Sequence, residues 1–275
     1  MNTRTIGFIG GGNMATSLMS GLIASGHSPQ QLWVSDTSST LLQSHRDNLQ
    51  VNVTADNAKI VQEVDVVVLA VKPQVLREVA LEIAPAIRQK KSLIVSIAAG
   101  ISQTSLALWL GSDVAIVRCM PNTPALVLTG ATALYANASV NEEQKDLAEN
   151  ILRAVGLSLW VNDEDQLDAV TAVSGSGPAY FFLMMEAMEK AAVDMGLTEH
   201  TARLLVQQTA LGAAKIALES TESPACLRER VTSPGGTTQK AIETFQQNGF
   251  AELVTKALLA ARDRSIEMSK QLGAD

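Results

Sequence analysis

A glycine-rich turn near the start of the chain has the spacing that suits a dinucleotide pyrophosphate. Gly10, Gly12 and Ala15 match the G-x-G-x-x-G/A pattern, with the apolar run 6–9 before it and an amphipathic segment after it. In this pattern the first glycine makes a tight turn, the second admits the phosphates and the small third residue lets a helix pack closely. The free N–H groups of that helix then favour an anion. We therefore predict cofactor contacts rather than a purely structural turn, at Gly10, Gly12, Asn13 and Met14.

A second glycine-rich stretch, residues 232–238, reads Thr-Ser-Pro-Gly-Gly-Thr-Thr and precedes a predicted helix. Two glycines bare the backbone at the helix N-terminus beside several hydroxyl groups, which is a construction that binds anions. The alternative is an ordinary N-cap, for which one serine or threonine would suffice. Two adjacent glycines raise the conformational entropy that is lost on folding, and an ordinary N-cap would gain nothing from them. We therefore predict a site for a substrate anion. Its candidate residues are Ser233, Gly236, Thr237 and Thr238.

Five further stretches read as strands that position these groups. They are 32–35, a short one near 51–53, 65–71, 93–97 and 114–119, and helical segments alternate with them. Such alternation indicates an α/β fold with a doubly wound, Rossmann-type parallel sheet, whose ligands bind at the carboxyl ends of the strands. Asp36 lies near the acidic position of the fingerprint. Further cofactor candidates at or near this edge are Ser35, Asp36, Asn57, Ala70, Val71, Lys72, Pro73, Ala98, Ala99, Gly100, Pro121 and Asn122.

The character of the chain changes after residue 162, and residues 166–275 read as helices. We therefore predict a dinucleotide-binding domain at 1–162 and an all-α substrate and dimerisation domain at 163–275. The segments 180–193 and 204–218 are apolar on too many sides for a lone helical domain of this size. An ordinary buried core is the alternative, but apolar surface of this extent favours a subunit interface.

The segment 174–180, Ser-Gly-Ser-Gly-Pro-Ala-Tyr, joins the two predicted domains. Small residues and a proline at a helix start suit a hinge beside a ligand, and Ser176 is a candidate there. A well-capped interdomain turn explains the same residues, so both interpretations stay open.

Composition excludes several functions. The net charge is −7 and no basic run stands out, so we expect no nucleic-acid partner. The longest apolar stretch, 66–71, is too short for a membrane span. Two distant cysteines suggest reduced thiols and a cytoplasmic protein, and no metal-binding pattern is present. The three histidines, His27, His45 and His200, stand among polar residues and are expected to be solvated at the surface.

The chain resembles the pyrroline-5-carboxylate reductase family over essentially its whole length. The resemblance rests on Phe8–Met14, Ala70–Pro73, Ser96–Gly100, Met120–Pro124, Ser174–Tyr180 and Ser233–Thr238. The first of these is shared with many dehydrogenases, whereas the last two in this order are specific.

The resemblance implies reduction of 1-pyrroline-5-carboxylate to L-proline, the last step of proline biosynthesis, by hydride transfer to the C=N bond. It implies NADPH as cofactor, with NADH also expected to work because of Asp36. It also implies a homodimer through the C-terminal helices that assembles into a larger ring. Thr238 and Ser176 are the candidate catalytic groups, as donors to the ring nitrogen, and Glu164 is a further candidate for substrate binding. Arg230 stands where some relatives carry an uncharged residue, which leaves its reach to the substrate carboxylate open.

Two rival functions predict different residues. A β-hydroxyacid dehydrogenase would need a lysine shortly after the turn 174–177, but the next lysine is Lys190. A non-catalytic NADP-binding sensor would keep the fold with a degraded substrate loop, yet the stretch 233–238 is intact.

Overall fold

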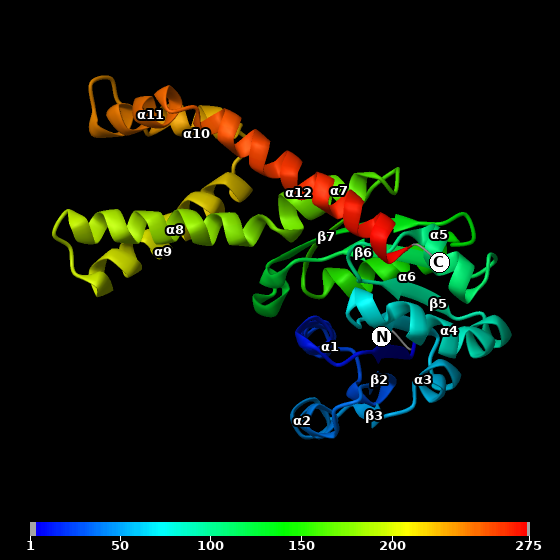
Figure 1. The fold of residues 1–275 in the computed structure, drawn as a ribbon. Coiled ribbons are helices and arrows are strands. Elements are labelled where there is room, and N and C mark those ends of the chain that lie inside the picture. The colour runs from blue at the N-terminus through cyan, green and yellow to red at the C-terminus, as the bar shows by residue number, and fades with distance from the viewer. Residues whose placement is uncertain (1–3, 274–275) are drawn as a thin grey trace. The chain divides into compact units, whose positions relative to one another are not determined.

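The computed structural model describes residues 4–273, which form two compact units (Figure 1). The first runs to Ser176 and takes in the chain again from Ala260, and the second is Gly177–Leu259. The sequence instead predicts a boundary after residue 162. The difference has a physical cause, because Leu167 and Ala172 are buried and Ser265 Oγ donates a 2.6 Å hydrogen bond to Asp168 Oδ1.

The first unit contains an eight-stranded sheet with the order β3-β2-β1-β4-β5-β6-β7-β8. Strands β1 to β6 are mutually parallel, as the sequence predicts. The strand order reverses between β1 and β4, which is the place where ligands bind in open α/β sheets. The six parallel strands are β1 (Ile6–Ile9), β2 (Leu32–Ser35), β3 (Asn52–Thr54), β4 (Val66–Leu69), β5 (Leu93–Ser96) and β6 (Ile116–Met120).

Two strands extend the sheet beyond the sequence prediction. β7 (Gly130–Ala136) pairs antiparallel with β6, and β8 (Gly156–Trp160) pairs parallel with β7 at the edge. Glycine and alanine dominate the start of β7, and β8 leaves Leu157 and Leu159 exposed. Neither strand therefore carries the continuous apolar run that marks β4 and β5.

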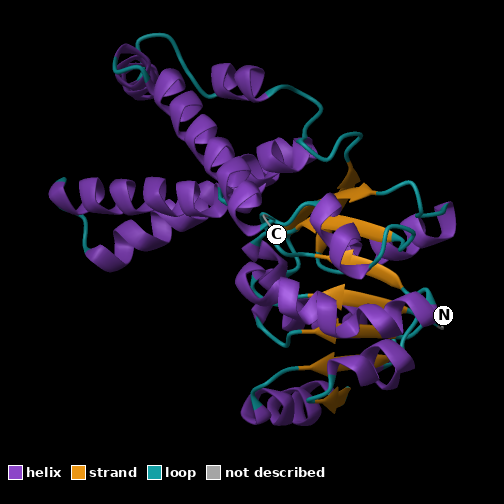
Figure 2. Ribbon diagram, turned by 45° about the vertical axis from the view of Figure 1, so that its right-hand side comes forward, coloured by secondary structure: helices purple, strands orange, loops and turns teal. Residues whose placement is uncertain are grey.

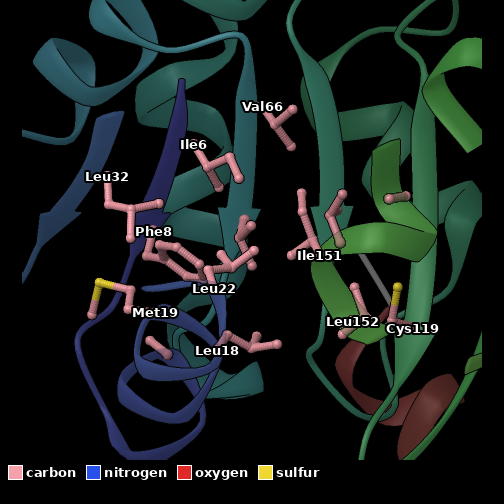
Figure 3. Packing of buried hydrophobic residues seen from close by; sticks show 14 of the residues in the cluster. Ile6, Phe8, Leu18, Met19, Leu22, Leu32, Val66, Cys119, Ile151 and Leu152 are labelled. Carbon is pink, nitrogen blue, oxygen red and sulfur yellow. The ribbon is translucent and has the colours of Figure 1, made fainter. Parts of the chain in front are cut away.

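Helices lie on both faces of the sheet and bury it (Figure 2). Alternate residues of one strand enter different cores: Phe8 packs with Leu18 of α1, whereas Ile9 belongs to the cluster on the opposite face (Figure 3). The helices of this unit are α1 (Asn13–Ala24), α2 (Ser39–Leu49), α3 (Asn57–Glu63), α4 (Pro73–Lys90), α5 (Gln103–Leu110), α6 (Glu142–Arg153) and α7 (Gln166–Val170). Short 3₁₀ turns occupy Pro29–Gln31 and Thr123–Val127, and one π turn occupies Thr171–Gly175.

The second unit is helical, as predicted. It consists of α8 (Gly177–Asp194), α9 (Glu199–Glu219), α10 (Pro224–Arg230), α11 (Thr237–Gln247) and the first part of α12 (Phe250–Leu272). Throughout residues 4–273, no helix combines the length and the apolar character that crossing a membrane requires.

Candidate active site

The loops that follow β1, β2, β4 and β5 meet at one edge of the sheet. The register aligns the last residues of these strands, with Ile9 opposite both Ser35 and Leu69, and Leu69 opposite Ser96. Parallel strands of equal register end together, so the predicted cofactor residues after each strand gather there.

The glycine turn after β1 requires a glycine at position 10 and leaves open space at position 12. Gly10 has φ +98°, and a Cβ on it would stand 2.8 Å from the Ala70 carbonyl carbon and 2.9 Å from the Val71 nitrogen. A side chain there is excluded both by conformation and by contact with the neighbouring loop. Gly12, in contrast, has open space around its Cβ position and is exposed. This open, bare backbone fits the pyrophosphate of a dinucleotide.

Three helices at the candidate loops begin without a side-chain cap. The N-cap residue is Gly12 for α1, Lys72 for α4 and Gly236 for α11, and none of the three hydrogen-bonds the first turn through a side chain. Their first N–H groups are therefore available to an anion, and the helix dipole favours one. Six other helices, α2, α3, α5, α6, α9 and α10, are capped by the polar side chains of Ser38, Asp56, Ser102, Asn141, Thr198 and Ser223, whereas α7 also lacks a side-chain cap.

The acidic position of the fingerprint is engaged with the backbone. Asp36 Oδ2 accepts the Gly11 N–H at 2.8 Å and Oδ1 accepts the Ser38 N–H at 2.9 Å. Two other predicted cofactor residues bind one another, since Ser35 Oγ donates to Asn57 Oδ1 at 2.7 Å. Ser35 is fully buried, so its hydroxyl serves this contact.

The loop after β5 and the π turn that ends before Ser176 border a small hollow within the first unit. Ala99, Gly100 and Ser176 line it together with Arg264 and Met268 of α12. A Cβ on Gly100, which has φ +71°, would lie 3.4 Å from Met268 Cβ. The end of α12 therefore closes over the predicted cofactor loop.

Asn122 connects two of the predicted loops. Its side-chain nitrogen donates to the Ser174 carbonyl at 3.0 Å, and its oxygen accepts the Ala131 N–H at 2.9 Å. Only 9% of Asn122 is exposed. Its side chain thus holds the Pro121 loop against the π turn that precedes Ser176. A π turn of this kind often marks a functional site.

In the second unit, the glycine stretch forms the start of α11. The Gly236 N–H donates to the Ser233 carbonyl at 3.0 Å, and the Gly235 N–H donates to Gln239 Oε1 at 2.6 Å. The turn itself uses the Gly236 N–H, so a substrate carboxylate would have to compete for this donor, and a role of Gly236 in substrate binding stays a prediction. The N–H groups of Thr237 and Thr238 stand in the uncapped first turn.

Two charged candidates have partners of their own. Glu164 forms an ion pair with Arg118, and its Oε1 also accepts the Gln103 N–H at 2.5 Å. Arg230 pairs with Glu222 Oε2 at 2.6 Å. An interaction of either residue with the substrate would have to compete with these contacts.

The histidine prediction is wrong at two positions. His27 is 7% and His45 3% exposed, because neighbouring helices cover them, whereas His200 is exposed as expected. Sequence reasoning missed His45 as a neighbour of the glycine turn, since its polar flanks signal a surface residue. Its ring nitrogen Nε2 lies 2.8 Å from the Gly11 carbonyl oxygen.

Of the two free cysteines, Cys119 is buried and Cys226 is exposed. Burial raises the pKa of the Cys119 thiol far above its usual range, and the charge of Arg118 lowers it only in part. A buried neutral thiol is a poor nucleophile. Among residues 4–273, no cluster of three or more metal-ligating side chains occurs.

The fold and this edge define the class of protein: an oxidoreductase with a Rossmann-type domain that binds NAD(P). Residues 5–100 match the family model described as NADP oxidoreductase, coenzyme F420-dependent. Residues 164–268 match the model described as pyrroline-5-carboxylate reductase dimerisation, which supports oligomerisation.

The chain belongs to the pyrroline-5-carboxylate reductase family. It is 53% identical to the pyrroline-5-carboxylate reductase of Pseudomonas aeruginosa, over 99% of this chain and 100% of that protein. The solved structure of the Coxiella burnetii pyrroline-5-carboxylate reductase is similar with a TM-score of 0.94 and 48% identity, covering 98% of this chain and 100% of that one. The Plasmodium falciparum pyrroline carboxylate reductase, solved with NADP bound, has a TM-score of 0.87 and 30% identity, covering 98% and 99%.

Proposed function

We propose that this protein reduces 1-pyrroline-5-carboxylate to L-proline with NAD(P)H. The full-length identity of 53% to a relative of that name carries the proposal. The open Gly12 turn, the uncapped helix starts and the intact stretch 233–238 are the features of this chain that support it.

We assign the cofactor to the edge of the sheet. The N–H groups at the start of α1 bind the pyrophosphate, with Gly10, Gly12, Asn13 and Met14 forming the turn. The loops Asp36–Ser39 and Ala70–Pro73 lie beside it, and the loops with Ala98–Gly100 and Pro121 hold the nicotinamide end. When bound, NAD(P)H supplies a hydride for the carbon of the substrate C=N bond.

We assign the substrate to the start of α11. Its carboxylate is an anion, and the N–H groups of Thr237 and Thr238 are donors at the positive end of a helix. Ser233 shapes the turn by accepting the Gly236 N–H. A carboxylate bound to the backbone survives side-chain substitution there, whereas a bulkier residue at Gly236 would press on the Ser233 carbonyl, 3.0 Å from its Cβ position.

The ring nitrogen needs a hydrogen-bonding partner as its charge changes. The imine accepts a hydride readily once it is protonated, and the nitrogen regains its lone pair as the carbon is reduced. A hydroxyl can follow this change by turning from acceptor to donor, and Thr238 and Ser176 are the candidates. Binding and orienting the substrate away from water supply the remaining acceleration.

We further propose that NADPH is preferred and that NADH also works. Asp36 disfavours a 2′-phosphate by its charge, but both of its oxygens already accept backbone N–H groups. Thr37, Ser38 and Ser39 are exposed beside it and offer hydroxyl donors to that phosphate. An NADH preference of about tenfold or more in kcat/KM would contradict this proposal.

Assembly as a homodimer through the second unit, and of dimers into a ring, is part of the proposal. Phe181, Phe182 and Leu183 of α8 are each more than 60% exposed in the single chain. Leu204 and Leu205 of α9 add more exposed apolar surface. Apolar surface of this density is typical of a subunit interface.

One assay tests the activity against its nearest rival. We expect NADPH to be oxidised with 1-pyrroline-5-carboxylate, with proline recovered as product, and no NADP reduction with 3-hydroxy acids. Turnover of 3-hydroxy acids alone would favour a β-hydroxyacid dehydrogenase. NADPH binding without any turnover would favour a sensor.

A further inference from the structure

The glycine turn is held from two sides by the side chains of His45 and Asp36, which come from outside the turn itself. His45 of α2 places Nε2 2.8 Å from the Gly11 carbonyl oxygen. A carbonyl only accepts, so this nitrogen carries the proton and donates it. From the other side, the Gly11 N–H donates to Asp36 Oδ2 at 2.8 Å. Thr16 Oγ1 also approaches the Gly11 carbonyl, at the longer distance of 3.4 Å.

These contacts decide where the next N–H group points. In a planar trans peptide the C=O and the following N–H point in opposite directions. Because the Gly11 carbonyl faces the buried ring of His45, the N–H of Gly12 faces away from it. Gly12 is exposed and has open space around its Cβ position. No partner for its N–H is seen among the described residues, so this donor is aimed at a ligand.

Close packing reinforces the arrangement. A Cβ on Gly11 would lie 2.9 Å from His45 Nε2, so the ring lies directly against the backbone of the turn. His45 is only 3% exposed, which fixes its position within α2. Asp36 completes the connection by accepting the N–H of Ser38, the residue that caps α2.

We propose that His45 is a positioning residue for the cofactor: with Asp36 it clamps Gly11 and thereby aims the Gly12 N–H at the pyrophosphate. The proposal rests on the proposed function only in taking NAD(P)H as the ligand. It gives Asp36 a role in shaping the turn, apart from any contact with a ribose hydroxyl.

A purely structural role for His45 makes a different prediction. If the ring only fills space between α2 and the turn, its loss lowers stability and leaves cofactor affinity unchanged. Removing a clamp instead frees the Gly11–Gly12 peptide to rotate, so affinity falls even where the fold is intact.

The experiment compares His45→Leu, His45→Gln and wild type by direct NADPH binding, followed by fluorescence, and by steady-state kinetics. Glutamine carries an N–H the same number of bonds from Cα as His Nε2, whereas leucine has none. We expect His45→Leu to raise both Kd and KM for NADPH at least about fivefold, as loss of one hydrogen bond implies. kcat and the substrate KM should stay near wild type. His45→Gln should restore affinity to within about threefold.

His27→Leu is the matched control, because His27 is similarly buried but its Nε2 has no partner and its surroundings are Leu22, Asn150 and Arg153. It should leave NADPH affinity unchanged. Normal NADPH affinity in His45→Leu, or equal losses in the leucine and glutamine variants, would overturn the proposal. If His45→Leu does not fold, His45→Asn takes its place in the comparison with His45→Gln. The amide of asparagine is one bond closer to Cα than that of glutamine. Failure of the proposed function has another signature: wild type that binds NADPH but leaves pyrroline-5-carboxylate unchanged.

Discussion

At the scale of single residues, the site proposed here relies largely on main-chain groups. Gly10 is required because its φ of +98° and its 2.8 Å approach to Ala70 exclude a side chain. The backbone of Gly12 is exposed, and the carboxylate of Asp36 accepts hydrogen bonds from two backbone N–H groups. If backbone groups bind the ligands, few side-chain substitutions can test a single step of the reaction. Thr238 is the best candidate for such a test.

Replacing Thr238 by alanine should lower the rate and leave binding largely intact. The substrate carboxylate is assigned to backbone N–H groups, which the substitution keeps, whereas the contact with the ring nitrogen is lost. A hydrogen bond to a charged group contributes about 1.5–3 kcal/mol, so kcat should fall about ten- to a hundredfold if the contact forms in the transition state. Steady-state kinetics decide this.

Thr238→Ser keeps the hydroxyl and should recover most of the rate. Thr255→Ala, which removes an exposed threonine of α12 bonded only to the Ala251 carbonyl, serves as the control. Full activity in Thr238→Ala would remove the hydroxyl from the mechanism and move attention to Ser176.

His27 should make stability depend on pH. Burial lowers its pKa, and its hydrogen bond with the Arg4 backbone opposes this only in part. The unfolded chain therefore takes up a proton below about pH 6.5 more readily than the folded one, and the free energy of unfolding falls as pH drops from there. The slope is at most about 1.4 kcal/mol per pH unit. Above that pH the contribution is fully present.

Chemical unfolding of wild type and His27→Leu between about pH 5 and pH 8 measures this directly. Wild type should lose stability relative to His27→Leu as pH falls, because only wild type carries the titrating ring. Arg153 lines the same hollow and forms an ion pair with Glu149. A difference that is constant with pH would show that His27 does not titrate differently on folding.

At the scale of elements, the helices at the loops assigned to cofactor and substrate begin differently from most of the others. α2, α5 and α6 begin with Ser38, Ser102 and Asn141, whose side chains bond the first turn. α1, α4 and α11 lack such a bond and begin at the loops assigned to cofactor and substrate. An uncapped start costs about 1 kcal/mol of helix stability, and an anionic ligand offsets that cost when it binds.

Giving α1 a cap should therefore stabilise the free protein and weaken the cofactor. Gly12 has φ −66° and nothing within 4 Å of its Cβ position, so a side chain fits. In Gly12→Asp the carboxylate bonds the N–H groups and repels the pyrophosphate. We expect an unchanged or higher Tm without cofactor and an NADPH Kd raised about a hundredfold or more, since both hydrogen bonds and charge oppose binding.

Gly12→Asn separates the two causes, because it caps without charge and should weaken NADPH less. Calorimetry gives the Tm and titration the Kd. An Asp variant that binds NADPH as wild type does would place the phosphates away from α1.

Much of the fold follows from sequence because its elements carry strong local signals. β4 and β5 are continuous apolar runs, and Gly10 and Gly12 lie between the end of a strand and the start of a helix. β7 and β8 lack such runs, since one is rich in small residues and the other is a half-exposed edge strand. The hydrogen-bond partners of individual groups could not be predicted from the sequence, because they depend on tertiary structure. The contact of His45 with Gly11 spans 34 positions, and the Gly236 N–H bond depends on how the turn closes.

At the scale of the whole molecule, the two units differ in how well they are buried. The first has a core on each face of its sheet. In the second, residues 177–259, all of them described, only Gly177, Ala192, Ala202 and Val206 are buried. A helical unit with so small a core lacks the apolar burial that offsets chain entropy. Its match to a dimerisation domain supports oligomerisation, and the proposed dimer would bury this surface.

A charge on the apolar face of α8 should therefore prevent assembly. Phe182 is 64% exposed in the single chain, and burying such a side chain contributes about 1.5–3 kcal/mol. In a twofold interface each substitution occurs twice, so Phe182→Glu removes this contribution twice and adds two buried charges. We expect light scattering at micromolar concentration to show a smaller or unfolded species without activity. The control is Leu108→Glu on α5 of the first unit, where Leu108 is 69% exposed and apolar, and it should keep the wild-type mass and activity. If Phe182→Glu kept the wild-type mass, or if wild type were an active monomer, the exposed face of α8 would need another explanation.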